Sequence, residues 1–521
     1  MMKCFERLVK NHIISISEVE ILDDGGLQLV ELTPIDPWLA DPRDPQELQE
    51  GEVKKESKVT YLTHACMELQ LAQKRFLFDP WLKGPAFARG WWLLHEPPAD
   101  SMDRLCMADL IYISHMHSDH LSYPTLKVLS ERRPDVPIYV GDIPNRPVFW
   151  YLEQSQVKLT NINIVPFGIW QDVDEHLRFM ILLDGVHPEM DTCIIVEYKG
   201  HMILNTVDCT CPNEGRLPQN VDLMLSDFAG GASGFPMTFY GGKYSESWKA
   251  DFIKNERKKL LNYKAQLVKS LQPRIYCPFA GYFVEAHPSD RYIKETNVKN
   301  TAESLNALIN KLTPGIMTWT PKPGAVLDLG LALGDPAHRY EAITNPPAGA
   351  KIYKDSWEFD LYVDELNSSI TSEIFKHRSW IQFYYTWAGF QNYNLVVRMT
   401  ETDDNFEPLR DGYDYLVDFV DLTFPTERPD REHSYIEVKN RIGVMRSVVL
   451  HGRLWDDLYI GFQNRIIRDP DIYHHKFWNH FQTKLPLHKP DWDQFLQQHT
   501  TTQEPDAPQE EPGRWSYCIE S

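Results

Sequence analysis

The pattern of apolar and polar positions divides the middle of the chain into short strands and longer helices. Strands are predicted where brief apolar or β-branched runs stand together or alternate with polar residues. The runs are residues 59–62, 67–71, 75–78, 109–114, 179–183, 202–207 and 275–279, with a turn at 73–74. Helices are predicted at residues 124–130 and, as the longest, at 245–271, where large apolar residues recur at helical spacing. This alternation predicts an α/β domain that closes at about residues 324–329.

The regions on either side of this domain have a different character. Residues 19–33 predict a β-hairpin, and a linker rich in proline and acidic residues follows up to residue 58. Beyond a Pro/Gly-rich connector, an aromatic-rich region with strand patterns at 395–399 and 413–419 predicts a smaller α+β domain. We therefore expect four regions. They are an N-terminal hairpin and linker (1–58), the α/β domain (59–334), the α+β domain (351–490) and a disordered tail (498–521).

Composition and charge narrow the classes of function. Apolar residues make up 42% of the chain and charged residues 24%, as in globular proteins. The net charge of −21 argues against a nucleic-acid or anionic-membrane partner. No uninterrupted apolar stretch approaches the length of a bilayer-spanning helix, and the first residues lack a secretory signal, so we expect a cytoplasmic protein. The basic run at residues 257–259 is expected to lie on a solvated helix face.

The eight cysteines include no Cys-x-x-Cys pair, which predicts free thiols in a chain of this kind. Cys209 and Cys211 lie beside Asp208 and could touch a site there. We interpret them as ordinary buried or loop thiols.

The residues best suited to metal binding cluster directly after the strand at residues 109–114. His115, His117, Asp119 and His120 place four potential metal ligands within six residues. Neutral imidazoles and carboxylates together suit zinc, iron or manganese better than calcium. The structural alternative is a polar turn that happens to be rich in histidine.

Three further candidates stand just beyond the ends of other apolar runs. They are His187, Asp208 and His287. Taken singly, each histidine has a plain alternative as a hydrogen-bonded surface or core residue. In the chain order H-x-H-x-D-H, then His, Asp and His, the set predicts a metal centre.

That order resembles the metallo-β-lactamase superfamily, whose members fold as an αββα sandwich, with two β-sheets between layers of helices. The resemblance implies one metal held by His115, His117 and His187. It implies a second metal held by Asp119, His120 and His287, with Asp208 bridging the two. Asp119 and Asp208 are the residues expected to be catalytic. One or two ions, of iron or zinc, fit this set of ligands.

Longer stretches resemble a narrower family, the cytidine monophosphate-N-acetylneuraminic acid (CMP-sialic acid) hydroxylases. These stretches are residues 78–98, 184–193 and 227–237, and the likeness runs from about residue 19 to about 492. The resemblance implies a monooxygenase that converts the N-acetyl group of CMP-sialic acid to N-glycolyl. It also implies O₂ and electrons from NADH, delivered by a reductase and a small b-type cytochrome to a Rieske-type 2Fe-2S cluster.

The cluster ligands of that family are two Cys and two His in Cys-x-His and Cys-x-x-His, placed before the hairpin. Here the residues before Val19 hold only Cys4 and His12. We therefore expect the hairpin to be the remnant of a Rieske domain whose cluster ligands are missing.

Two other functions stay open. One is a metal-dependent hydrolase, such as a phosphodiesterase, in which Asp208 anchors a nucleophilic water. The other is a non-catalytic remnant that binds CMP-sialic acid.

Substrate contacts have candidates of two kinds. Arg89, Trp91 and Trp92 could bind a phosphate or carboxylate and stack on cytosine, or could serve as core and rim residues. Gly230 and Gly231 could offer backbone N–H groups to a phosphate, or form a plain tight loop.

Overall fold

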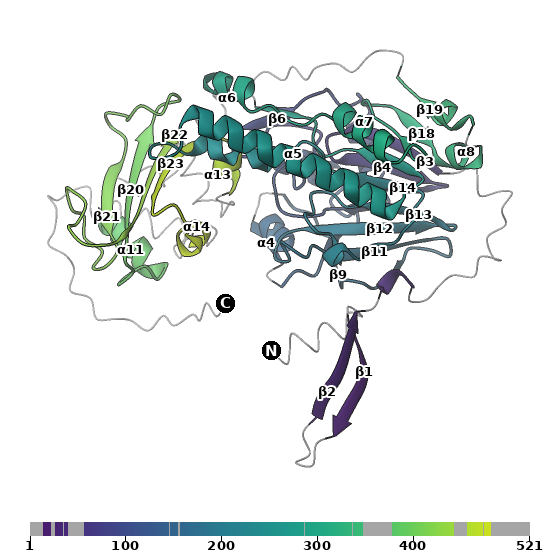
Figure 1. Ribbon diagram of the computed structural model, residues 1–521, viewed down its shortest axis with the longest axis horizontal. Coiled ribbons are helices and arrows are strands. Elements are labelled where there is room, and N and C mark those ends of the chain that lie inside the picture. The colour runs from purple at the N-terminus through teal and green to yellow at the C-terminus, as the bar shows by residue number, and fades with distance from the viewer. Residues whose placement is uncertain are drawn as a thin grey trace. The chain divides into compact units, whose positions relative to one another are not determined.

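The computed structural model describes most of the chain, in two compact units (Figure 1). The described residues are 14–21, 27–34, 36–39, 57–144, 146–154, 157–285, 287–335, 337–346, 378–441, 456–472 and 474–480. The first unit comprises Met1–Trp357 with Asp456–Gln463, and the second comprises Glu358–Trp455 with Asn464–Ser521. Residues 456–463, which we expected in the C-terminal domain, thus group with the first unit.

The N-terminal hairpin is confirmed. Strands β1 (Ile14–Ile21) and β2 (Leu27–Pro34) pair antiparallel, and a short 3-10 helix, η1 (Pro37–Leu39), follows. The hairpin tip, most of the predicted linker and the predicted tail lie outside the described residues.

The first unit contains an eight-stranded sheet in the order β19-β18-β3-β4-β5-β7-β8-β9. Strands β5, β7, β8 and β9 run parallel to one another, whereas β3, β4 and β5 form an antiparallel meander. Strand β19 lies in the predicted connector, so the domain extends beyond residue 334. The bounds are β3 (Ser57–Thr63), β4 (Cys66–Leu71), β5 (Lys74–Phe78), β7 (Leu110–Tyr112), β8 (Ile138–Gly141), β9 (Ile162–Val165), β18 (Val326–Asp328) and β19 (Ile343–Thr344).

A seven-stranded sheet, in the order β10-β11-β12-β13-β14-β15-β17, forms the second layer. Its first four strands are antiparallel neighbours and its last four are parallel. The bounds are β10 (Gln171–Asp172), β11 (Leu177–Leu183), β12 (Thr192–Tyr198), β13 (His201–Asn205), β14 (Leu223–Ser226), β15 (Ile275–Pro278) and β17 (Met317–Thr318).

The two sheets pack face to face through apolar side chains. The ring of Phe179 on β11 lies 5.6 Å from that of Phe76 and 5.0 Å from that of Tyr139, both on the other sheet. The hydroxyl groups of Tyr112 and Thr192 are 2.7 Å apart across the same interface. Strands buried on both faces need apolar residues at every position, which explains why their sequences read as continuous apolar runs.

Helices cover the outer faces, which confirms the expected αββα sandwich. Helix α5 begins after Ser245, whose hydroxyl accepts the Trp248 N–H, and it runs beside α7 over the seven-stranded sheet (Figure 1). The bounds are α2 (Ser101–Cys106), α3 (Tyr123–Arg132), α4 (Pro147–Gln154), α5 (Glu246–Leu271), α6 (Arg291–Thr296), α7 (Ala302–Leu312) and α8 (Leu329–Gly334). Short 3-10 helices are η4 (Asn213–Gly215), η5 (Gly231–Thr238), η6 (Pro288–Asp290) and η7 (Arg339–Ala342).

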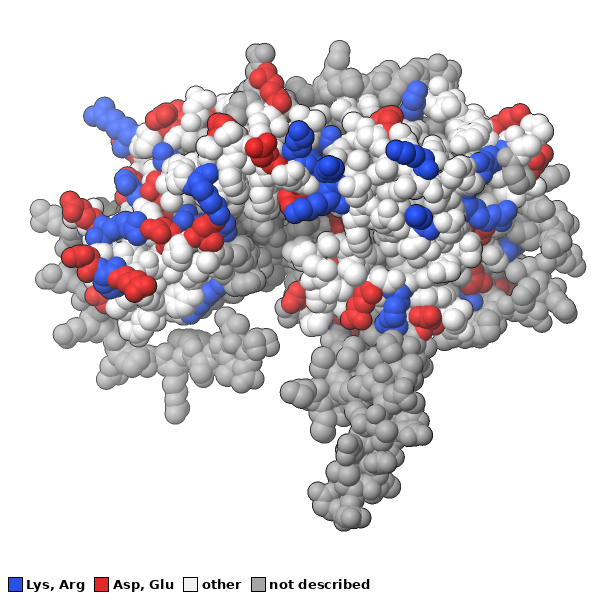
Figure 2. Space-filling view, viewed as in Figure 1, with Lys and Arg blue, Asp and Glu red and all other residues white. Residues whose placement is uncertain are grey.

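The prediction of a solvated basic run on α5 is confirmed for Lys258 and Lys259 but is wrong for Arg257. The Arg257 side chain is buried, where it donates to the Ala229 carbonyl and to Asn297. A helix turns about 100° per residue, so adjacent residues of one charged run lie on different faces. Elsewhere, basic and acidic side chains are interspersed over the visible face (Figure 2).

The second unit is a smaller α+β domain, as expected. Its four strands have the order β21-β20-β22-β23, with β20 and β22 parallel. After β22 the chain adds α13 to the first unit and then returns as β23. The bounds are α11 (Arg378–Trp387), β20 (Leu395–Thr402), β21 (Asp414–Asp418), β22 (Ser434–Arg441), α13 (Asp456–Ile460), β23 (Asn464–Asp469) and α14 (His475–His480). Among the described helices, none has the length and apolar character needed to cross a bilayer.

Candidate metal centre

The loop that follows β7 carries the H-x-H-x-D-H motif. The backbone N–H groups of His120 and Leu121 both donate to the His117 carbonyl, at 3.0 and 2.7 Å, which folds the loop into a tight turn. The side chains of His115, Asp119 and His120 are consequently buried together at the carboxyl end of β7.

One set of donor atoms gathers around His115. Its Nε2 lies 2.9 Å from Nδ1 of His117 and 3.9 Å from Oδ1 of Asp191. Two ligand atoms that each lie about 2.0–2.1 Å from one ion are separated by roughly 3.0–3.4 Å. The 2.9 Å separation of the two imidazole nitrogens lies close to this range and fits atoms that share a metal ion, whereas the Asp191 oxygen lies farther away, at 3.9 Å.

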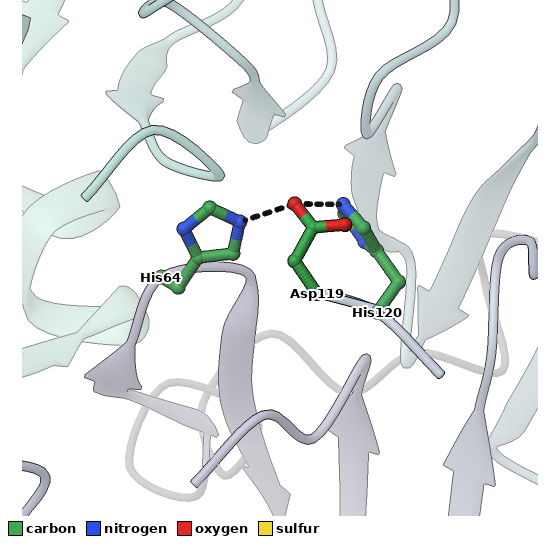
Figure 3. A group of neighbouring side chains, drawn as sticks. All are labelled: His64, Asp119 and His120. Carbon is green, nitrogen blue, oxygen red and sulfur yellow. Dashed lines mark hydrogen bonds and ion pairs between the residues drawn. The ribbon is translucent and has the colours of Figure 1, made fainter. Parts of the chain in front are cut away.

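A second set gathers around His120 (Figure 3). Its Nε2 lies 3.3 Å from Oδ2 of Asp208 and 3.5 Å from Oδ2 of Asp119. His64 lies in the turn between β3 and β4, and its Nε2 is 3.1 Å from Oδ2 of Asp119. Because Asp208 also forms a compact group with His115 and His120, it stands between the two sets, as a bridging ligand would.

Asp79 fixes the orientation of two imidazoles, that of His120 directly and that of His115 through Ser114. Its carboxylate accepts the Ser114 backbone N–H and hydroxyl, and it accepts Nδ1–H of His120 at 3.0 Å. Because the single hydroxyl hydrogen of Ser114 goes to Asp79, the oxygen is left to accept Nδ1–H of His115, at 2.9 Å. This network assigns both histidines the tautomer that leaves Nε2 with a lone pair for a metal.

The electrostatics of the cluster fit a cation. Burial lowers the pKa of His115 well below its ordinary value, and the neighbouring imidazoles add to this effect. Burial alone would lower the pKa of His120, but Asp119, Asp208 and Asp79 raise it well above the ordinary value. Burial raises the pKa of Asp191 to about 7, whereas His120 and His115 outweigh burial and lower that of Asp208.

Buried carboxylate oxygens are also left without hydrogen bonds. Among the described residues, these include Oδ1 of Asp119, Oδ1 of Asp191 and Oδ1 of Asp208. Burying a carboxylate oxygen without a donor is costly, and metal ions bound by the two sets would satisfy these oxygens. The residues therefore fit the metal that the sequence implies.

A buried ion pair holds the backbone next to Asp208. Lys264 of α5 pairs with Asp227 and donates to the Cys209 carbonyl at 3.1 Å, directly after Asp208. Asp227 raises the pKa of Lys264 against the opposing effect of burial, so the lysine stays charged. Cys209 itself is buried with a raised thiol pKa, which supports its interpretation as a structural thiol.

The structure does not bring two predicted ligands into these sets. His187 is exposed on the turn that precedes β12. His287 is buried after β16 (Phe283–Glu285), where its Nδ1 accepts the Ser289 N–H. Among the described residues, the compact groups of potential ligands are His64, Asp119 and His120, and His115, His120 and Asp208. They include neither His187 nor His287, and they also lack His117 and Asp191.

Near His115, where the sequence predicts His187, the structure places Asp191, whose Oδ1 lies 3.9 Å from Nε2 of His115. The turn is closed by the Asp184 N–H, which donates to the Asp191 carbonyl, and by the His187 N–H, which donates to the Asp184 carboxylate. Asp191, the residue before β12, is consequently buried, whereas His187 stays exposed. No motif marks Asp191, or the contact of His64 with Asp119, in the sequence.

The tryptophans predicted to contact substrate are packed against other parts of the protein. Trp91 and Trp92 are buried on β6 (Trp91–Leu93), which pairs with β16. The Trp91 ring stacks on Phe283, with the centroids 3.6 Å apart, so this face is closed to a cytosine. Arg89 is half-buried on the loop before β6.

Backbone conformation explains the glycine at position 230, and close packing explains the glycine at position 231. Gly230 adopts the left-handed conformation, with φ of 64°. A Cβ on Gly231 would lie 2.4 Å from the Trp91 ring. The close approach of this loop to the tryptophan therefore requires glycine.

The chain is similar to several known proteins. The profile described as "Beta-lactamase superfamily domain" matches residues 58–177. Two solved structures show a distant likeness, a metallo hydrolase from Ignicoccus hospitalis and CmlA, a diiron β-hydroxylase from Streptomyces venezuelae. The first is 13% identical with a TM-score of 0.34 and covers 52% of this chain and 97% of its own. The second is 14% identical with a TM-score of 0.32 and covers 52% and 53%.

Similarity to curated proteins is far higher and extends over almost the whole chain. The cytidine monophosphate-N-acetylneuraminic acid hydroxylase of Danio rerio is 72% identical over 481 residues, which cover 92% of this chain and 80% of that protein. The protein of the same name from Mus musculus is 70% identical over 478 residues, covering 92% and 82%. The chain therefore belongs to the cytidine monophosphate-N-acetylneuraminic acid hydroxylase family.

Proposed function

We propose that this chain hydroxylates CMP-N-acetylneuraminic acid to the N-glycolyl form at the centre formed by His115, His117, Asp119, His120, Asp191 and Asp208. The observation that carries the proposal is the convergence of these side chains, with imidazole tautomers set by Asp79 and Ser114. The names of the relatives supply the substrate and the reaction.

The proposed division of labour follows from the two sets of donors. His115, His117 and Asp191 would hold one ion, and Asp119 and His120 a second, with Asp208 between them. Such ions, if they are iron, supply the redox chemistry that side chains lack. The Nε2–H of His64 donates to Asp119 and holds that carboxylate in place.

The reaction also needs electrons from outside this centre. Inserting one oxygen atom of O₂ into a C–H bond consumes two electrons and two protons, and the other oxygen atom leaves as water. We propose NADH as the source, with a reductase and a b-type cytochrome as carriers. The proposed entry point is a Rieske-type 2Fe-2S cluster on a separate module, because the residues before Val19 hold only Cys4 and His12. This redox chain rests on the family resemblance, and the protein is proposed to act in the cytoplasm.

The test is turnover of purified protein with CMP-N-acetylneuraminic acid, O₂, NADH, the reductase, the cytochrome and a Rieske-type 2Fe-2S protein. Mass spectrometry would detect the gain of one oxygen atom in the acyl group. A His115→Ala variant is the matched control, because it removes a central ligand. Product from the wild type alone supports the proposal, whereas equal product from both proteins would refute the assignment of the site.

The same geometry supports a second candidate, hydrolysis of a phosphodiester. Two ions that share Asp208 can acidify a bound water, and this chemistry needs no redox partner. The same incubation, without O₂ and NADH, separates the two functions. Release of CMP under these conditions would favour the hydrolase, whereas unchanged substrate would count against it.

A further inference from the structure

We infer that residues 457–462, more than three hundred positions after the metal-binding loop, form a wall of that loop and position it. The inference rests on the proposed metal centre, since the loop in question is the one that carries His117 and Asp119. Every predicted ligand precedes residue 290, so the sequence contains no hint of this dependence. In the structure, residues 456–463 belong to the first unit.

Ser118 makes the direct connection. Its hydroxyl oxygen accepts the Phe87 backbone N–H at 2.6 Å and its hydrogen points to Oδ1 of Asp457 at 3.3 Å. Ser118 stands between His117 and Asp119 in the motif, so its position constrains both neighbours. The Phe87 ring, in turn, lies 5.5 Å from the ring of His117.

Two glycines allow backbone to lie directly on backbone at this contact. A Cβ on Gly461 would lie 2.0 Å from the Phe87 carbonyl oxygen and 2.7 Å from that of Asp457. A Cβ on Gly90 would lie 2.1 Å from the Gly461 carbonyl oxygen. These neighbours are main-chain atoms and cannot rotate aside, so any side chain at either position must separate the two segments.

Further contacts anchor the segment on both sides of the glycine. The Trp91 indole N–H donates to the Ile460 carbonyl at 3.1 Å, and the Trp91 ring packs on Phe87 at 4.4 Å. Phe462 is fully buried in a cluster with Met237, Ile253 and Ile293, which belong to η5, α5 and α6. Residues 457–462 are therefore held in place by contacts that do not involve the loop with His117 and Asp119. They can in turn hold that loop in position.

The decisive variant is Gly461→Ala, because the backbone at this position lies outside the left-handed region and alanine is conformationally allowed there. Gly315→Ala is the matched control, since no atom lies within 4 Å of its added Cβ. The first readout is amide hydrogen exchange of a peptide covering residues 113–121 in metal-free protein. We expect about tenfold faster exchange in Gly461→Ala and wild-type exchange in Gly315→Ala.

The second readout uses Co²⁺ as the probe, because its visible spectrum reports the geometry of the ligands. We expect Gly461→Ala to bind Co²⁺ about tenfold more weakly, with an altered spectrum. If the wild type takes up no Co²⁺, the proposed metal centre fails, while the exchange measurement still decides the role of the segment. Unchanged exchange of residues 113–121 in Gly461→Ala would overturn the inference.

A milder pair of variants covers the case in which Gly461→Ala does not fold. Asp457→Ala removes the acceptor for the Ser118 hydroxyl, and Asp457→Asn retains an oxygen that can accept it. We expect faster exchange of residues 113–121 in the alanine variant and rescue in the asparagine variant. Equal exchange in the alanine variant and the wild type would count against the positioning role.

Discussion

His120 places one ring nitrogen, Nδ1, 3.0 Å from the Asp79 carboxylate and the other, Nε2, 3.3 Å from the Asp208 carboxylate. The imidazole thus connects a carboxylate that orients it to one that faces the proposed metals. A ligand held in this way meets an ion without first reorganising. Four predictions follow from this and related contacts.

Asp79→Asn should weaken metal binding even though Asp79 is not assigned as a ligand. An amide in the same place no longer offers two acceptor oxygens to Ser114 and His120, so the tautomer of His120 loses its support. Loss of such a partner typically lowers metal affinity about 10–100-fold. Competition with a chromophoric chelator measures the change. Wild-type affinity in Asp79→Asn would show that the ligand orientation has another source.

His115→Ala and His187→Ala should separate the inner ligand from the exposed residue. His115 is buried and its Nε2 lies 2.9 Å from the His117 ring, whereas His187 is exposed on its turn. We expect His115→Ala to lose bound metal and His187→Ala to retain it, as measured by elemental analysis of purified protein. Metal loss in His187→Ala would restore that residue to the ligand set.

Asp191→Asn should stabilise the metal-free protein at high pH. Burial raises the pKa of Asp191 from 3.8 to about 7, so between these values the folded chain binds more protons than the unfolded chain. Stability therefore falls as the pH rises through this window, and the full cost, up to about 4 kcal/mol, is present above pH 7. The asparagine variant removes this cost.

Chemical denaturation at pH 5 and pH 8 in the presence of a chelator measures the effect. The gain from Asp191→Asn should be larger at pH 8, and the same variant should bind metal more weakly. No gain in stability at pH 8 would mean that the ionised Asp191 carboxylate does not destabilise the folded, metal-free protein.

Gly231→Ala should destabilise the first unit by about 1–3 kcal/mol, because its Cβ would lie 2.4 Å from the Trp91 ring and 2.7 Å from that of Phe283. Gly334→Ala, whose Cβ meets no atom within 4 Å, is the control. Thermal unfolding measures both variants. A neutral Gly231→Ala would indicate that the loop is free to move, as a substrate-binding loop could be.

The sequence predicted much of the sandwich because its strands are buried on both faces and read as apolar runs. The motif from His115 to His120 was predictable for a related reason, since it follows one such strand at the edge where side chains converge. The approach of Asp191 to His115, with His187 left exposed, was not predictable, because it depends on how the Asp184 side chain closes a turn.

Long-range packing explains the other differences. The assignment of Arg257 to a solvated face failed because charge alone does not reveal an internal partner such as Asn297. The approach of Gly461 to Phe87 joins segments whose separation in the chain leaves no local pattern. Strand β19 was missed because it is short and lies in a stretch whose prolines and glycines indicate a loop.

The most direct test of the central claim is the metal content of purified protein, measured together with acid-labile sulfide. We expect two metal ions per chain at this centre, with both lost in a His115→Ala, His120→Ala double variant that retains the wild-type circular dichroism. Sulfide, if present, would report a cluster elsewhere and is subtracted from the iron count. Wild-type metal content in the folded double variant would contradict the assignment of this centre.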